Sequence, residues 1–104
     1  MIAVICHLGL PDDWTPGKAR SIFKDSTGKF ENIQGLIRKS FLLAEDGRSA
    51  AGVYRWESRA PAEAFFTEAW KDFMVGKYGN RPKVTYYECP VVVDNQTGEV
   101  IKAA

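Results

Sequence analysis

The alternation of apolar and polar positions along the chain predicts four β-strands. Residues 2–9 carry apolar side chains on both alternating faces, which is typical of a strand in the middle of a sheet. The Asp46-Gly47 pair predicts a tight hairpin turn between two of the strands. The stretches with strand-like patterning are 2–9, 36–43, 50–57 and 83–93, and a further short strand is expected over 99–102.

Apolar residues at helical spacing predict two helices between these strands. The first begins at Thr15, whose hydroxyl can cap the helix, with Pro16 at the first helical position. The second begins at Ser58 and presents a broad apolar face. Gly76 and Gly79 are expected to end this second helix.

The resulting order, β-α-β-β-α-β, predicts an α+β fold of the ferredoxin-like type. Its four antiparallel strands are ordered 4-1-3-2 and both helices cover one face of the sheet. The length of 104 residues suits one domain over residues 1–104, with 95–104 as an extension.

The opposite face of this sheet is predicted to be too apolar for contact with water. The strands over 2–9 and 83–93 offer apolar side chains on both sides, so a second covering layer is needed. We expect a second copy of the chain to supply it in a two-fold homodimer. The alternative is a monomer whose open face is moderately apolar.

Composition narrows the class of protein further. The formal net charge is +1 and the basic residues are scattered, so neither nucleic acid nor a membrane surface is expected as a partner. The first residues lack the features of a signal peptide, no apolar run is long enough to cross a bilayer, and a cytoplasmic location is expected. Cys6 and Cys89 form neither a disulfide framework nor a metal-binding spacing. Three Trp, four Tyr and six Phe exceed what one small core needs, which favours a pocket or an interface lined by rings.

Few residues of the sequence offer catalytic chemistry. The single histidine, His7, lies in a strand among apolar neighbours and acts either as a hydrogen-bonded core residue or as a proton acceptor facing a pocket. Because there is one histidine, a multi-histidine metal site within one chain is excluded, and we expect no metal. Arg38 and Lys39 point to opposite faces of their strand. One is expected in solvent and the other could meet an anionic group.

Tyr54 and Trp56 share one face of their strand. On the helix side they would meet Phe65 and Phe66, or Phe23, either as plain core or as the wall of a ligand pocket. The predicted strand order also brings His7 close to them if the faces agree.

The stretch 52–66, Gly-Val-Tyr-Arg-Trp-Glu-Ser-Arg-Ala-Pro-Ala-Glu-Ala-Phe-Phe, preceded by Gly-Leu-Ile-Arg-Lys at 35–39, resembles the monooxygenases of the dimeric α+β barrel superfamily. This superfamily includes antibiotic-biosynthesis and heme-degrading monooxygenases. With the strand order, the resemblance spans about residues 1–94. It implies a homodimer with one pocket per subunit between sheet and helices. It also implies, for the quinol-type members, oxygenation without metal or flavin.

The resemblance places individual residues as well. Trp56 matches a tryptophan that lines the pocket, and His7 falls near a pocket asparagine of the heme-degrading members. Two departures count against parts of it. Residues 60–75 contain no histidine to bind heme iron, and Gly52 stands where some quinol oxygenases have a polar residue.

Our first hypothesis is therefore a cofactor-independent monooxygenase of a small aromatic, quinol-like compound, with O2 as co-substrate. His7 and Trp56 are its catalytic candidates, and the residues expected to contact the substrate are Tyr54, Phe65, Tyr86 and Phe23. The alternatives are a non-catalytic small-molecule-binding or stress-related dimer, and an isomerase or decarboxylase on the same scaffold.

Overall fold

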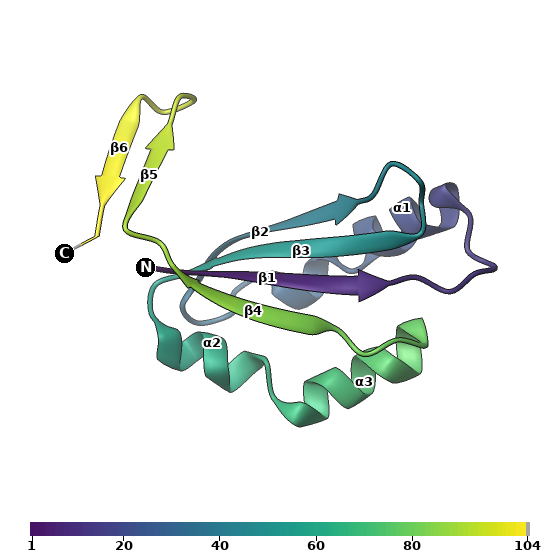
Figure 1. Cartoon of the computed structure of the whole chain (residues 1–104). Coiled ribbons are helices and arrows are strands. Elements are labelled where there is room, and N and C mark those ends of the chain that lie inside the picture. Colours follow the sequence, from purple (N-terminus) through teal and green to yellow (C-terminus); the bar gives the residue numbers. More distant parts are fainter. Residues whose placement is uncertain (104) are drawn as a thin grey trace.

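A four-stranded antiparallel sheet with all helices on one face forms the body of the protein, in a computed structural model that describes residues 1–103 (Figure 1). The strands lie in the order β2-β3-β1-β4, which confirms the predicted 4-1-3-2 order read from the other edge. Their bounds are Ile2–Gly9 for β1, Leu36–Leu43 for β2, Ser49–Trp56 for β3 and Lys83–Glu88 for β4.

Helices α1 and α3 begin at a capping threonine, whereas Ser58, the expected cap of the second helix, makes no capping hydrogen bond. Thr15 Oγ1 accepts a hydrogen bond from the Lys18 N–H at 3.1 Å, and Pro16 occupies the first turn, as predicted. The second predicted helix is two helices, because Thr67 starts a new one by accepting from the Trp70 N–H at 3.1 Å. The bounds are Pro16–Asp25 for α1, Thr27–Phe30 for the 3-10 helix η1, Arg59–Phe65 for α2 and Glu68–Tyr78 for α3.

The two glycines expected to stop the second helix behave differently. Gly79 ends α3 in the left-handed conformation, with φ 74°, which glycine adopts without steric cost. Gly76 lies inside α3, so the prediction that it ends the helix was wrong.

The predicted final strand over 83–93 is also interrupted. β4 ends at Glu88, and Pro90 has no N–H to continue a ladder. The chain then forms a separate hairpin of β5, Val91–Asp94, and β6, Glu99–Lys102, that projects from the body (Figure 1). The short strand expected over 99–102 is therefore present, but it pairs with β5 alone among the described strands.

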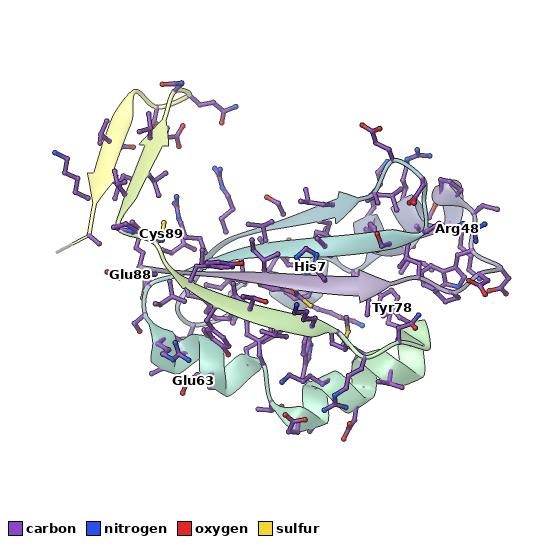
Figure 2. All side chains as sticks on the ribbon, viewed as in Figure 1. His7, Arg48, Glu63, Tyr78, Glu88 and Cys89 are labelled. Carbon is purple, nitrogen blue, oxygen red and sulfur yellow. The ribbon has the colours of Figure 1, made fainter. Side chains whose placement is uncertain are left out.

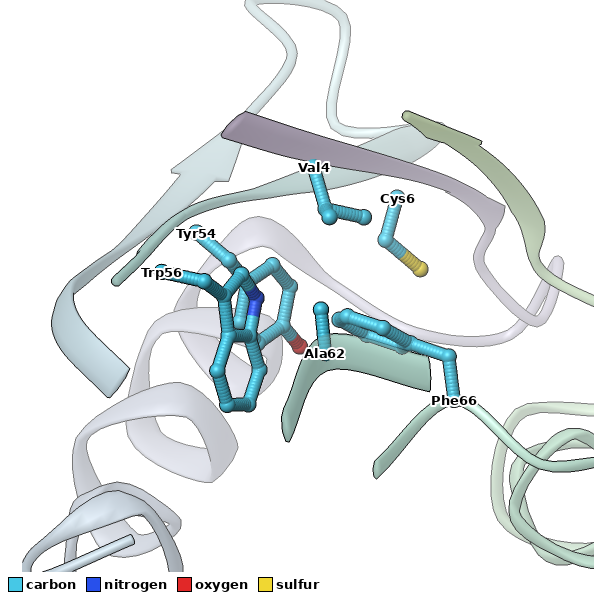
Figure 3. Close-up of a cluster of buried hydrophobic side chains, with 6 residues drawn as sticks. All are labelled: Val4, Cys6, Tyr54, Trp56, Ala62 and Phe66. Atoms are coloured by element: carbon cyan, nitrogen blue, oxygen red, sulfur yellow. The ribbon is translucent and has the colours of Figure 1, made fainter. Parts of the chain in front are cut away.

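The register of β1 and β3 fixes which residues face the helices. Val4 pairs with Tyr54 and Ile2 with Trp56, so these side chains share the helix side. Figure 3 shows Tyr54 and Trp56 side by side, pointing from β3 toward Ala62 and Phe66. All of them except Ile2 are buried, and this cluster is the main part of the core.

The other face of the sheet is covered by none of the described helices. Tyr87 and Leu42 are 51% and 46% exposed there, alongside the polar His7 and Lys83. The projecting hairpin likewise exposes apolar side chains, with Val93 66% exposed. The open face is therefore a mixture of apolar and polar residues.

Candidate functional site

A cavity of about 470 Å³ lies between strand β2 and helices η1, α2 and α3. Phenylalanine rings from η1, β2, α2 and α3 form most of its wall, together with Trp70. A second, smaller cavity of about 40 Å³ shares Lys39, Phe41, Met74 and Tyr78 with it and extends toward Cys6 and Gly52. The larger space is of the size at which proteins bind small organic ligands.

Lys39 is the charged residue that lines both of these cavities. It pairs with Tyr54 across β2 and β3, which points its side chain to the helix side of the sheet. Its Nζ lies 3.4 Å from the ring centroid of Phe30, 3.8 Å from that of Phe41 and 4.7 Å from that of Tyr54. The ion pairs formed within residues 1–103 do not include Lys39. An amine in an aromatic cage, without a carboxylate partner, is an unusual arrangement for a lysine.

This environment changes the protonation of Lys39. Burial, with a smaller contribution from the positive charge of Lys77, lowers the pKa of Lys39 from 10.5 to about 7. Burial also raises the pKa of the neighbouring Cys6 thiol to about 11, so at neutral pH Cys6 supplies no thiolate to balance the charge. The ring faces offset part of the cost of burying the ammonium. Near pH 7 both forms of the amine are therefore populated, and Lys39 can accept a proton.

Two further lysines line the large cavity closer to solvent. Lys77 Nζ donates to Ser26 Oγ at 3.3 Å, and Lys29 Nζ lies 5.4 Å from the ring centroid of Phe73. Burial and the adjacent Lys29 lower the pKa of Lys77. None of the described residues that line this cavity is acidic. The wall of the site is therefore mostly apolar, and its charged side chains are all lysines.

The structure distributes the sequence-predicted aromatic residues over several places. Phe65 lines the large cavity, and Tyr54 and Phe23 line the small one. Trp56 is fully buried and lines neither, but its ring stacks on Tyr54 at a centroid distance of 6.3 Å and an interplanar angle of 12°. Tyr86 also lies outside both cavities, packed against Phe66 at 6.2 Å. Three of these five residues therefore line a cavity.

His7 lies away from all of these groups. It pairs with Ala51 in β1 and β3 and belongs to the alternate face from Val4 and Cys6, where its side chain is exposed (Figure 2). The sequence hypothesis required His7 and Trp56 to share a face, and the register places them on opposite faces of the sheet. His7 thus does not reach the cavity of the same chain.

Gly52 explains how Tyr54 comes to occupy the base of the small cavity. A Cβ built on Gly52 would lie 2.8 Å from Cε1 of Tyr54, which is closer than real contacts allow. The tyrosine ring therefore fills the space that a side chain at position 52 would use. A polar residue there, as in some quinol oxygenases, would require Tyr54 to move.

Comparisons with known proteins support the fold. Neither a protein-family model nor the sequence of a curated protein matches the chain. A solved structure from Deinococcus radiodurans, presumed to be an antibiotic biosynthesis monooxygenase, matches with a TM-score of 0.68 at 9% identity, covering 90% of this chain and 97% of that one. MhuD R26S with two manganese protoporphyrin IX molecules per active site matches with a TM-score of 0.65 at 16% identity, covering 91% and 100%.

A third solved structure is described as cofactor-independent. SnoaB, an oxygenase from Streptomyces nogalater, matches with a TM-score of 0.61 at 12% identity, covering 85% of this chain and 91% of its own. The chain has the ferredoxin-like α+β fold of the antibiotic biosynthesis monooxygenases, and the resemblance noted in the sequence is confirmed at the level of the fold.

MhuD binds a porphyrin whereas SnoaB is described as cofactor-independent, and the residues of this cavity decide whether it suits heme. The histidine that the resemblance requires from the second helix is absent from the sequence, and the single histidine lies on the other face of the sheet. The part of the chain that the structure describes also brings no three His, Cys, Asp or Glu residues together as a metal site. The cavity residues therefore do not fit a histidine-ligated heme.

No helix among residues 1–103 has the length and apolar character needed to span a membrane.

Proposed function

We propose that the protein is a cofactor-independent monooxygenase of a small phenolic or quinol-like compound, with Lys39 as the proton acceptor. The observation that carries this proposal is the unpaired, partly buried Lys39 amine in the wall of an aromatic cavity. It takes the place of His7, which faces away. Trp56 contributes by holding the Tyr54 ring in position rather than by touching the substrate.

The proposed chemistry needs few groups from the protein. Lys39 removes the phenolic proton, and the electron-rich anion reacts with O2 in a site from which the rings exclude water. In a hydroquinone, one oxygen atom of O2 converts a ring C–H into C–OH. The diol is oxidised to a dione, and the other oxygen atom of O2 leaves as water. The substrate supplies all four electrons, so atoms and charges balance without an external reductant.

The likeness to SnoaB supports an oxygenase that works without a cofactor, while MhuD shows that the same fold accommodates a porphyrin. The absence of a suitably placed histidine favours the first of these two alternatives for this chain.

The test of this function is oxygen consumption by the purified protein. With a panel of hydroquinones and anthrones, and with metal chelator present and no flavin added, we expect substrate-dependent O2 uptake with one oxygen atom from ¹⁸O2 in the product. Heat-unfolded protein is the control for spontaneous oxidation. Uptake that appears only after heme, flavin or metal is added would contradict the proposal.

We also propose that a second copy of the chain covers the open face of the sheet. Tyr87, Leu42 and the exposed valines of the β5–β6 hairpin support this, since about half or more of each of these apolar side chains is exposed in the single chain. We expect a dimer mass in sedimentation equilibrium at micromolar concentration. Replacing Tyr87 with Lys should shift the equilibrium toward monomer, whereas Lys24→Glu on α1 should leave it unchanged. A wild-type protein that sediments as a monomer would refute the dimer.

A further inference from the structure

The large cavity carries more positive charge than its proposed reaction needs. Lys39 alone suffices to accept a proton, yet Lys29 and Lys77 also line the same cavity and none of its described lining residues is acidic. Among the described residues, the acids that form ion pairs are Glu63, Glu68 and Asp72. Their partners are Arg59, Lys71 and Arg81, not the lysines of the cavity. The three cavity lysines thus have no carboxylate neighbour in an ion pair.

We propose that the cavity binds an aromatic ligand that carries a carboxylate, with its ring between the phenylalanine and tryptophan side chains and its acid group against Lys29 and Lys77. This inference deepens the proposed function and rests on it for the identity of the reacting ring.

The positions of the lysines give the ligand a direction. Lys39 lies among Phe30, Phe41 and Tyr54 and is more deeply buried than Lys77, whereas Lys29 is exposed. A carboxylate keeps part of its hydration at the outer end, where burying it costs least. The phenol is then directed inward, toward the amine that removes its proton.

The positive charges of Lys29 and Lys77 repel each other when no anion is bound between them. Lys29 is one of the groups that lower the pKa of Lys77, and the Lys77 amine donates to the neutral Ser26 hydroxyl. A bound carboxylate would accept from both amines and remove this repulsion. Phe73, whose ring lies beneath Lys29 and is 55% exposed, is an apolar surface that the ligand's ring would cover.

The size of the cavity sets the ligand class. About 470 Å³ accommodates one or two fused aromatic rings with small substituents. An aromatic acid of this size, such as a dihydroxybenzoate or a hydroxynaphthoate, carries both groups. Its phenol would meet Lys39, and its carboxylate would meet Lys29 and Lys77.

The experiment compares 2,5-dihydroxybenzoate with its methyl ester, which has the same ring and phenols without the charge. Binding is measured by quenching of tryptophan fluorescence in oxygen-free buffer, so that turnover plays no part; Trp70 lies in the cavity wall. We expect the acid to bind at least about tenfold more tightly than the ester, and this preference to weaken as salt is raised.

Variants identify the groups responsible. Lys29→Gln combined with Lys77→Gln should remove the preference for the acid, so that acid and ester bind with similar affinity. Lys102→Gln, on β6 away from the cavity, is the control that removes a positive charge without effect. Equal binding of acid and ester by the wild type, or a preference that survives the double substitution, would overturn the inference.

The result also separates this inference from the proposed function. A preference for the acid without O2 uptake would leave the ligand assignment standing and reject the oxygenase. Oxygen uptake with equal binding of both compounds would do the reverse.

Discussion

Replacing Lys39 with methionine is expected to lower the rate of oxygenation by about 10²–10⁴-fold, the range that a positioned acid–base group contributes. Methionine keeps the length and apolar stem of lysine, so the cage of Phe30, Phe41 and Tyr54 stays filled. The amine that accepts the phenolic proton is then the only group lost. The rate is measured as O2 uptake with a phenol that the wild type oxygenates.

The pH profile provides an independent readout of the same residue. Because the pKa of Lys39 is about 7, the wild-type rate should rise with pH through this region, as the amine loses its proton and becomes a base. The variant should lose this rise, and Lys39→Arg, which stays protonated, should be as slow as Lys39→Met. Lys102→Met is the matched control. A Lys39→Met protein that is folded and turns over within a few-fold of the wild type would exclude Lys39 as the base.

The same lysine should make the stability of the protein depend on pH. In the unfolded chain Lys39 binds a proton up to its ordinary pKa of 10.5, whereas in the folded protein it loses the proton near pH 7. Between these values the unfolded state binds more protons, so the free energy of unfolding rises with pH. At roughly 1.4 kcal/mol for each pH unit, the gain between pH 7 and pH 9 amounts to about 2 kcal/mol after allowance for the ring contacts.

Comparing the wild type with Lys39→Met isolates this contribution. Cys6 and Tyr54, which lie near Lys39, have pKa values raised by burial, so they act in the opposite direction and mainly above pH 9. Urea unfolding at pH 7, 8 and 9 should show the free energy of unfolding of the wild type rising relative to that of the variant. At pH 7 the variant should be the more stable of the two. A difference between the two proteins that is constant over this range would show that Lys39 keeps its proton in the folded state.

Local signals in the sequence were sufficient for much of the fold. Thr15-Pro16 marked the start of α1 because a cap and a fixed φ act over a few residues, and the Asp46-Gly47 turn connects β2 and β3 as expected. The break at Thr67 was missed. Apolar spacing continues through it, although Thr67 offered a second capping hydroxyl that could have revealed it.

The candidate site was predicted only in part, and the reason lies in the register of β2. Simple alternation from Leu36 would place Arg38 on the helix side and Lys39 in solvent. An irregularity between Leu36 and Arg38 in the pairing with β3 reverses this, so that Lys39 pairs with Tyr54 and faces the cavity. One extra residue therefore decides which of two basic side chains meets the ligand.

The sequence by itself determined most of the elements, the strand order and the gathering of Tyr54 and Trp56 on one face, because these depend on period and on residues near in the chain. Only the tertiary structure decided that His7 faces away from Trp56 and that Lys39 lies among three aromatic rings. The face a strand presents is set by its pairing with neighbouring strands and by burial against the helices, and a shift of one residue moves every side chain to the other side.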